Sequence, residues 1–298
     1  MTNKVLIIGG TGFLGKNVIF KLQSLNFNII SISRKKKLPK NKRNIKYLSL
    51  NIFNKKEFNK IKKINFDYIF NFGGNINHKN STETYKAHYL GVKNMINSLN
   101  FESLKYFVQI GSSLEYGESV SPQSEKSKCD PCSFYGKAKL KASKFLISKF
   151  KMIRKKIIIL RPYQVYGPYQ KFDRLVPHVI KNCLRNNNFN CTQGNQLRDF
   201  LYIDDFVNLL VKILRSKKVK SGIYNVGYGK PIKVNLIINK INSLVGKGKP
   251  IFGKIKMRKD EINSLYPNIK KIKKRLKWRP KINLEKGLKK TIEYYKNV

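Results

Sequence analysis

Acidic residues are scarce in this 298-residue chain, which has 16 Asp and Glu against 63 Lys and Arg and a formal net charge of +47 at pH 7. A charge of this sign favours nucleic acid, anionic membranes or small acidic ligands as partners. The basic residues are spread over the whole chain, however, and runs such as RKKK (34–37) and KKIKKRLK (270–277) are typical of solvated faces. The charge therefore helps a polyanionic ligand to arrive without identifying it.

Cysteines and long apolar runs are also rare. Only Cys129 and Cys132 form a C-x-x-C pair, and Cys183 and Cys191 lie eight residues apart, so we expect no metal site; a redox role for CDPC is a minor alternative to an ordinary loop. No apolar run approaches the roughly 20 residues that a membrane span needs. The opening MTNKVLIIGG is expected to be a strand rather than a signal peptide. A reducing, cytoplasmic location fits this pattern.

Hydrophobic residues make up 41% of the chain and aromatic residues 12%, which is enough for a sizeable core. The first half alternates strand-like and helical patterns, which predicts parallel strands joined by right-handed crossovers. The strand-like runs are 4–8, 28–33, 45–50, 67–72, 106–111 and 156–161, and the helical patterns are 13–25, 55–63, 82–99 and 135–153.

This alternation predicts an α/β fold with a doubly wound parallel (Rossmann) sheet over residues 1–165. Residues 166–298 have a less regular pattern and are expected to form mainly a smaller α/β substrate lobe, from which some elements return to the first domain. Helices are expected near 174–186, 204–215 and 233–245, strands at FNCTQ and YNVG, and two short helices around WRP.

Three glycines lie at the first strand–helix junction. The segment VLIIGGTGFLGKNVIFKL carries Gly9, Gly12 and Gly15, with G-x-x-G-x-x-G spacing. Glycines at such a junction permit a tight turn, close approach of backbone amides to a pyrophosphate, and close packing of helix on strand. This position in the alternating pattern predicts a dinucleotide site rather than a purely structural turn.

The end of the second strand indicates which dinucleotide binds. An NAD site usually offers Asp or Glu to the adenosine ribose here, but no carboxylate occurs from Asn28 to Lys37. Ser33 and Arg34 supply instead the hydrogen-bond donors and positive charge that suit a 2′-phosphate. NADP is therefore the predicted cofactor, and NAD remains the alternative.

Further motifs follow in a fixed order. Together they resemble the extended short-chain dehydrogenase/reductase family of nucleotide-sugar epimerases, dehydratases and reductases over almost the whole chain. The motifs are GGTGFLG (9–15), GSSLEYG (111–117), YGKAK (135–139), LRPYQVYGP (160–168), RDFLYIDD (198–205), YNVGYG (224–229) and the C-terminal LKWRPKINLEKGLKKTI. The resemblance implies NAD(P)-dependent enzyme chemistry and a homodimer.

The resemblance also implies which residues bind. Cofactor contacts are expected from Gly9, Thr11, Gly12, Phe13, Leu14, Gly15, Ser33, Arg34, Asn51, Ile52, Phe72, Gly73, Tyr135, Lys139 and Pro162, and substrate contacts from Ser112, Ser113, Gln164 and Arg198. The guanidinium fork of Arg198 matches the oxygens of a diphosphate, and the alternative is a structural pair with Asp199 or Asp204. Arg161 is expected to support its turn.

Tyr135 and Lys139 are the predicted acid–base pair, with Ser112 as the third catalytic residue. Residues four apart lie on one face of a helix, about 6 Å apart along its axis. A nearby ammonium favours the phenolate form of a tyrosine and brings its pKa toward neutrality. Such a tyrosine can exchange a proton with a sugar hydroxyl or ketone while a hydride moves.

Departures from the family pattern narrow the reaction. The 4,6-dehydratases carry an acid directly after the Ser112 position, but Ser113 and Leu114 follow here and Glu115 comes one place late. Epimerases usually carry an acid at the end of the second strand. The sequence therefore favours NADPH-dependent reduction of a nucleotide-linked 4-keto-6-deoxy sugar, for example CDP-4-keto-3,6-dideoxyglucose, in surface polysaccharide (O-antigen) biosynthesis, as in CDP-abequose synthase-type reductases.

Two other interpretations stay open. An NAD-dependent 4-epimerase is the nearer alternative, and a non-catalytic dinucleotide- or RNA-binding protein is a remote one that leaves the catalytic residues unexplained. His88 and Gln164 stand where the family commonly has Asn, so either contact is altered or lost. For His88, a packed histidine and a ligand role are equally expected. The small residues of NFGG (71–74) would let a cofactor approach.

Overall fold

The structure is a computed structural model that describes residues 3–74, 80–216, 218–258 and 261–298. The chain forms two compact units, which we describe separately. The first consists of residues 1–119, 128–161 and 210–224, and the second of residues 120–127, 162–209 and 225–298.

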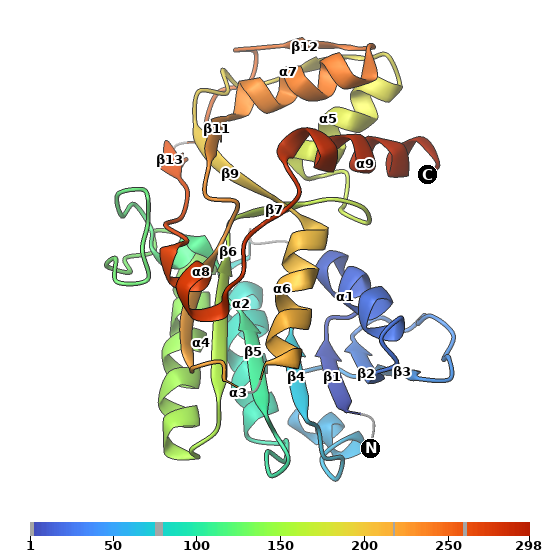
Figure 1. Cartoon of the computed structure of the whole chain (residues 1–298), viewed down its shortest axis with the longest axis vertical. Coiled ribbons are helices and arrows are strands. Elements are labelled where there is room, and N and C mark those ends of the chain that lie inside the picture. Colours follow the sequence, from blue (N-terminus) through green and yellow to red (C-terminus); the bar gives the residue numbers. More distant parts are fainter. Residues whose placement is uncertain (1–2, 75–79, 217, 259–260) are drawn as a thin grey trace. The chain divides into compact units, whose positions relative to one another are not determined.

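A seven-stranded sheet forms the centre of the first unit (Figure 1). Its order is β10-β6-β5-β4-β1-β2-β3, and the paired strands from β6 to β3 run parallel. The strands are β1 (Lys4–Ile8), β2 (Asn28–Ser33), β3 (Ile45–Ser49), β4 (Tyr68–Asn71), β5 (Tyr106–Ile110), β6 (Ile157–Pro162) and β10 (Gly222–Val226). The central strands are buried along most of their length because helices cover both faces, as parallel sheets require.

Alternating side chains of the strands pack against different helices. Ile69 belongs to the core cluster that also contains Met95 and Leu146, whereas the hydroxyl of its neighbour Tyr68 donates to the carbonyl of Leu214 in α6. Figure 1 shows α1 and the end of α6 in front of the sheet. The helical elements of this unit are α1 (Phe13–Gln23), a 3₁₀ turn η1 (Lys55–Lys60), α2 (Ser81–Tyr85), a π-helical turn η2 (Lys86–Leu90), α3 (Gly91–Ile96), η3 (Ser113–Glu115) and α4 (Phe134–Met152).

The second unit contains a small mixed sheet and amphipathic helices. In the sheet, β9 (Leu197–Tyr202) pairs with β7 (Gln164–Tyr166), β11 (Pro231–Lys233) and β13 (Ser264–Leu265), and β8 (Asn188–Asn190) pairs separately with β12 (Lys249–Ile251). The helices are α5 (Leu175–Leu184), α7 (Val234–Val245), α8 (Lys270–Leu276) and α9 (Leu284–Lys296). Helix α6 (Ile203–Arg215) begins in this unit and ends in the first.

The predicted doubly wound α/β sheet is confirmed, with each of its six expected strands in place. Four local features differ. The helix expected over 55–63 is only a 3₁₀ turn, and the one over 82–99 is interrupted by the π turn. The FNCTQ strand is limited to β8, while β9 forms where we expected none.

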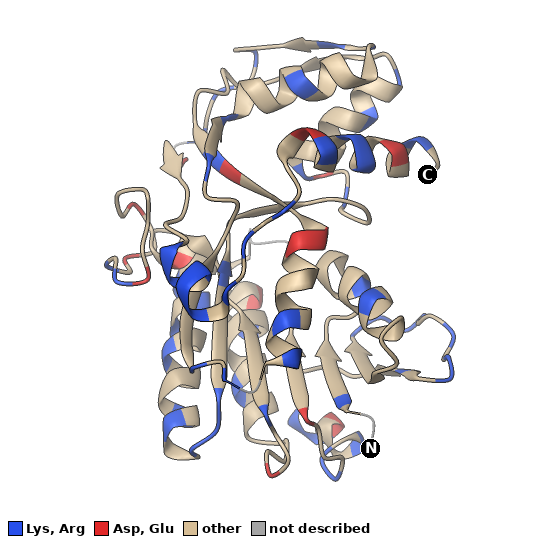
Figure 2. Cartoon of the chain, viewed as in Figure 1, with Lys and Arg blue, Asp and Glu red and all other residues tan. Residues whose placement is uncertain are grey.

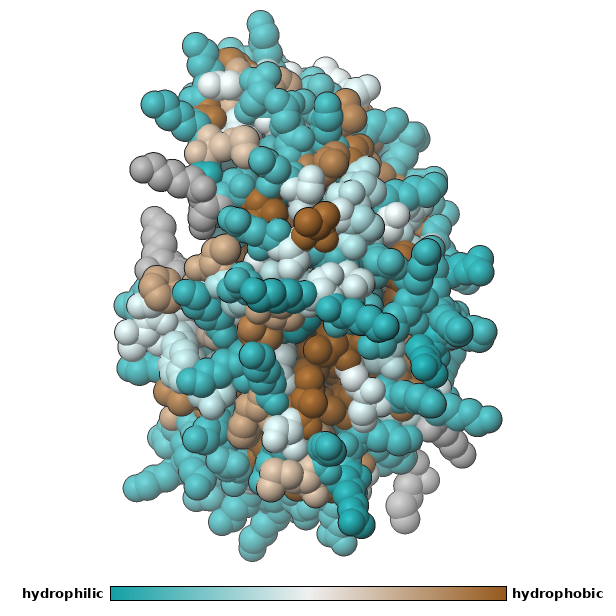
Figure 3. Space-filling view, turned by 90° about the vertical axis from the view of Figure 1, so that its left-hand side faces the viewer, coloured by the Kyte–Doolittle hydropathy of each residue, from teal (hydrophilic) through white to brown (hydrophobic). Residues whose placement is uncertain are grey.

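Basic residues lie on helices and loops throughout the described chain, with few acidic ones among them (Figure 2). Hydrophilic residues cover most of the face in Figure 3, and a hydrophobic strip is visible between them. In the described part of the chain, no helix combines the length and apolarity needed to cross a membrane.

Candidate active site

The glycine turn after β1 is tight and leads directly into the N-terminus of α1. Gly9 has a φ of +78°, which favours glycine, and its N–H donates to the carbonyl of Ile32 at 2.9 Å. A Cβ at Gly15 would stand 2.4 Å from the Gly9 carbonyl oxygen, so only glycine fits there. Gly12 caps the N-terminus of α1, whose first-turn amides and dipole favour an anion. Phe13 and Leu14 follow in that first turn.

The end of β2 offers donors without a carboxylate. The hydroxyls of Thr11 and Ser33 lie 2.8 Å apart, which ties the glycine turn to this strand end. Arg34 is exposed, and its guanidinium carbon lies 4.9 Å from the centre of the Phe53 ring. This stacking holds Arg34 beside Ser33 at the end of β2. The two residues therefore fit a dinucleotide that carries a 2′-phosphate on its adenosine ribose.

The ends of β3 and β4 complete this edge of the sheet. The backbone N–H of Asn51 donates to Glu57, and Ile52 is buried beneath Gly91.

At the end of β4, the Asn71 side chain donates to the side chain of Gln109 at 2.8 Å and accepts the N–H of Gly73 at 2.9 Å. Phe72 lies between Asn71 and Gly73 in the sequence. A Cβ at Gly73 would meet Ile8 at 2.7 Å, and one at Gly74 would meet the His88 ring at 2.2 Å. Packing therefore requires glycine at both positions.

Tyr135 and Lys139 lie one turn apart in α4, as predicted. The helix begins at Phe134 because the Ser133 side chain accepts the N–H of Gly136 at 3.1 Å. Lys139 is 5% exposed, and its Nζ donates to the carbonyl oxygen of Ile110 at 2.7 Å and lies 5.7 Å from the centre of the Tyr135 ring. Burial lowers the pKa of Lys139 to about 8, against the attraction of the Glu115 carboxylate, which raises it.

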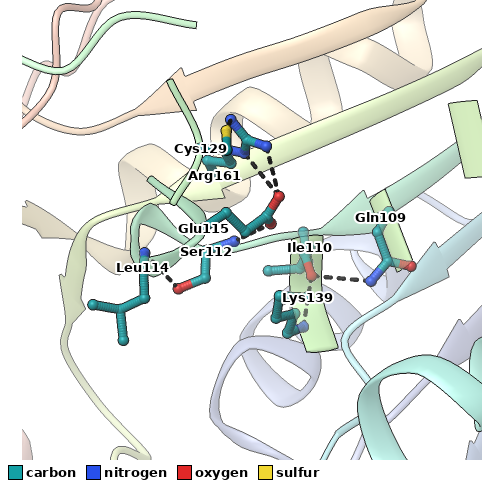
Figure 4. A network of polar contacts seen from close by, with 8 residues as sticks. All are labelled: Gln109, Ile110, Ser112, Leu114, Glu115, Cys129, Lys139 and Arg161. Carbon is teal, nitrogen blue, oxygen red and sulfur yellow. Dashed lines mark hydrogen bonds and ion pairs between the residues drawn. The ribbon is translucent and has the colours of Figure 1, made fainter. Parts of the chain in front are cut away.

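Ser112 lies directly after β5 and caps the 3₁₀ turn η3. Its Oγ accepts the N–H of Leu114 at 3.2 Å, which leaves the hydroxyl hydrogen to be donated to a ligand. Its own N–H donates to Glu115 at 2.9 Å, so serine and glutamate form a reciprocal capping box. Figure 4 shows this turn above Lys139, with Ile110 between them. Ser113, a predicted substrate contact, is buried in the turn.

A buried ion pair supports the turn. Arg161 Nη2 and Nε donate to Glu115 Oε2 at 2.7 and 3.0 Å, and the two side chains are 1% and 0% exposed. Arg161 was expected to support its turn, and the structure identifies Glu115 as its partner. The sequence predicts no contact between Arg161 and Glu115, because the two residues lie far apart along the chain.

His88 lies against Tyr135. The ring centres of His88 and Tyr135 are 4.8 Å apart and nearly perpendicular, and His88 is 4% exposed. This contact joins the π turn η2 to α4, which fits the packing alternative for His88. Insertion of a π turn changes which side chains face α4.

The remaining predicted residues belong to the second unit. Pro162 ends β6, and Gln164 is exposed at the start of β7. Arg198 is 6% exposed and forms an ion pair with Glu261, and it also donates to the carbonyl of Leu197 at 2.7 Å.

Neither structural partner that we considered for Arg198 pairs with it. The Asp199 carboxylate instead accepts the backbone N–H groups of Tyr228, Gly229 and Lys230 at 2.6 to 3.1 Å, which fixes the YNVGYG turn. Within the described residues, no three His, Cys, Asp or Glu side chains gather as a metal ion would require.

The fold and the Ser–Tyr–Lys arrangement define a Rossmann-type oxidoreductase. The profile of the NAD dependent epimerase/dehydratase family matches residues 5–227, and the chain belongs to that family. This membership confirms the predicted class, an NAD-dependent nucleotide-sugar enzyme of the epimerase/dehydratase type.

Individual relatives span different reactions. The chain is 29% identical to a putative UDP-glucose 4-epimerase of Methanocaldococcus jannaschii and 26% identical to a CDP-abequose synthase of Salmonella muenchen, with 98% of each chain covered. Its fold matches the solved structure of UDP-glucuronic acid 4-epimerase from Bacillus cereus in complex with UDP-glucuronic acid and NAD, with a TM-score of 0.89, 23% identity and 99% of each chain covered.

Proposed function

We propose that this enzyme reduces a nucleotide-linked 4-keto-6-deoxy sugar with NADPH, for example CDP-4-keto-3,6-dideoxyglucose. The observation that carries the proposal is the combination of a complete Ser112–Tyr135–Lys139 set with a second strand that ends in Ser33 and Arg34 and lacks a carboxylate. Similarity along the whole chain to a CDP-abequose synthase supports the same substrate class. The product would serve surface polysaccharide synthesis, including O-antigen.

The residues divide the work between proton transfer and orientation. A reduced nicotinamide, when bound, supplies the hydride for C4 of the sugar. Tyr135 then donates its phenolic proton to the oxygen that becomes an alkoxide, and Ser112 donates a hydrogen bond to the same oxygen and keeps it in line. Lys139 is held by the Ile110 carbonyl with its charge near the Tyr135 ring, where it stabilises the phenolate that the transfer leaves.

Contacts to the nucleotide part of the substrate are proposed for the second unit. Arg198 is suited to diphosphate by its planar guanidinium, and binding would require Glu261 to share or release it. Gln164, which is exposed, would donate or accept a hydrogen bond through its amide, and Ser113 would contribute through the η3 turn. We propose further that the enzyme acts in the cytoplasm as a homodimer.

A 4-epimerase is the second candidate because a putative UDP-glucose 4-epimerase matches the chain end to end. Tyr135 would then remove and return the proton of the hydroxyl at C4, while a bound dinucleotide would accept the hydride from C4 and return it to the opposite face of the sugar. An epimerase needs no external reductant and should purify with its dinucleotide bound, whereas a reductase must exchange its cofactor at every turnover.

Absorbance of NADPH with a panel of 4-keto nucleotide sugars tests the proposal. Wild-type enzyme should consume NADPH with at least one of them, and Tyr135→Phe should lower kcat by about 10²–10⁴-fold while NADPH affinity is largely kept. The matched control is Tyr47→Phe, the same change on β3 of the same unit. Interconversion of two sugars without NADPH consumption would instead establish the epimerase.

A further inference from the structure

We infer that Glu115 is a positioning residue of this active site, which fixes the Ser112 turn and the backbone of Ser112. The inference rests on the proposed roles of Ser112 and Lys139 and adds a residue to them. It depends on two observations: the hydrogen bond from Ser112 to Glu115 and the buried ion pair of Glu115 with Arg161.

The two carboxylate oxygens of Glu115 have separate partners. Oε1 accepts the backbone N–H of Ser112 at 2.9 Å, while Oε2 accepts two N–H groups of Arg161. Gly111 makes room for this arrangement, since a Cβ there would stand 2.4 Å from Oε1. The carboxylate therefore acts as a bridge between the strand β6 and the backbone of the catalytic serine (Figure 4).

Arg161 has little freedom to release the carboxylate. Its Nη1 donates to the Cys129 sulfur at 3.4 Å, and its guanidinium carbon lies 4.4 Å from the centre of the Tyr116 ring. Both members of the pair are buried, so a change of one alone leaves the other charge without compensation. Arg161 thus fixes the orientation of Glu115, and Glu115 in turn fixes the backbone of Ser112.

The same carboxylate acts on Lys139 through space. The charged or titratable groups around the Lys139 ammonium are Tyr135 on α4, Glu115 on η3, His88 on η2 against the tyrosine ring, and Arg161 on β6 behind the glutamate. Burial lowers the pKa of Lys139 to about 8, and the attraction of Glu115 opposes that fall. Lys139 loses its proton as pH rises through this value. Removing the Glu115 charge should lower the pKa of Lys139 further, so that the proton is lost at a lower pH.

Two double variants separate the hydrogen bond from the charge. E115Q/R161M and E115M/R161M both remove the ion pair without leaving a buried charge, and replacement of such pairs by apolar residues is often neutral for stability. They differ in whether residue 115 can still accept the N–H of Ser112. We expect kcat of E115M/R161M to be about 10- to 100-fold below that of E115Q/R161M, with KM for NADPH within about threefold.

The pH profile gives the second readout. In both double variants the decrease of kcat at alkaline pH should occur at a lower pH than in wild type. The Lys139 ammonium, followed by ¹⁵N NMR in enzyme without dinucleotide, should also lose its proton at a lower pH. Asp67→Asn is the matched control, because Asp67 accepts the backbone N–H of Lys4 at 2.8 Å and pairs with Lys105 at the opposite ends of the strands. It should lower Tm and leave both readouts unchanged.

Equal kcat in the two double variants, together with an unmoved alkaline limb, would overturn the inference and reduce Glu115 to a structural residue. Failure of the proposed function is distinguishable from this result. It would appear as wild-type protein that consumes no NADPH with any 4-keto sugar, while the shift in the Lys139 titration would still be measurable.

Discussion

At the scale of single residues, Arg34 offers the sharpest test of cofactor choice. Removing its guanidinium in Arg34→Ala should raise KM for NADPH by about 10- to 100-fold, the worth of a hydrogen bond to a charged group, because the 2′-phosphate loses its cation. KM for NADH should stay within about twofold, since NADH has no such phosphate. Initial rates with the two cofactors measure the difference.

Lys37→Ala is the control for Arg34, as it removes one charge from the same exposed basic run. Equal losses with both cofactors in Arg34→Ala would show that Arg34 supports the fold of this strand end instead of reading the phosphate. An enzyme that already prefers NADH would contradict the assignment of NADP.

Single residues also show where the sequence stops being informative. Tyr135 and Lys139 could be placed on one helix face because their spacing alone determines it. The Glu115–Arg161 pair could not, since its members are separated by a whole crossover and meet only when β5 and β6 pair. The sequence does not predict the pair of Arg198 with Glu261 for a related reason: Glu261 reaches Arg198 from a segment whose path no local pattern predicts.

At the scale of elements, the turn before α1 separates structural glycines from ligand-contacting ones. A Cβ at Gly12 would meet only the Gly9 carbonyl oxygen, at 3.3 Å, whereas one at Gly15 would meet backbone atoms of Gly9 and Gly10 at 2.4 and 2.5 Å. Gly12→Ala should therefore keep Tm within a few degrees and weaken NADPH binding, because its methyl occupies the approach to the phosphates.

Gly15→Ala should lower both Tm and NADPH affinity, since the turn itself must shift. Thermal unfolding and fluorescence titration with NADPH, measured on the two variants in parallel, distinguish these effects. Unchanged cofactor affinity in Gly12→Ala would show that this glycine does not face the dinucleotide.

Element prediction succeeded where a run of side chains repeats a buried pattern. The core strands β1, β4 and β6 contain continuous apolar runs bounded by polar residues, which is typical of strands covered on both faces. Three-residue strands such as β7 and β11 are too short to show any period. The π turn η2 likewise depends on how α2 and α4 pack, and no local propensity records it.

At the scale of the whole molecule, the net charge of +47 should make stability depend on salt. Like charges repel in the compact state, and screening becomes effective when the Debye length falls from about 30 Å at 0.01 M to about 8 Å at 0.15 M ionic strength. We expect Tm to rise by several degrees over this range in sodium chloride. A fall in Tm would show that attractive ion pairs outweigh the repulsion.

The strand β10, formed by Gly222–Val226, takes its place beside β6 at the edge of the central sheet. The other strands of that sheet are therefore synthesised well before β10, the strand that pairs with the edge of β6. Until then β6 is an unpaired and strongly apolar edge strand, of the kind that can pair with strands of other chains and cause aggregation. Emergence of the chain through Val226 from the ribosome, rather than emergence of α4, is what allows β10 to pair with β6.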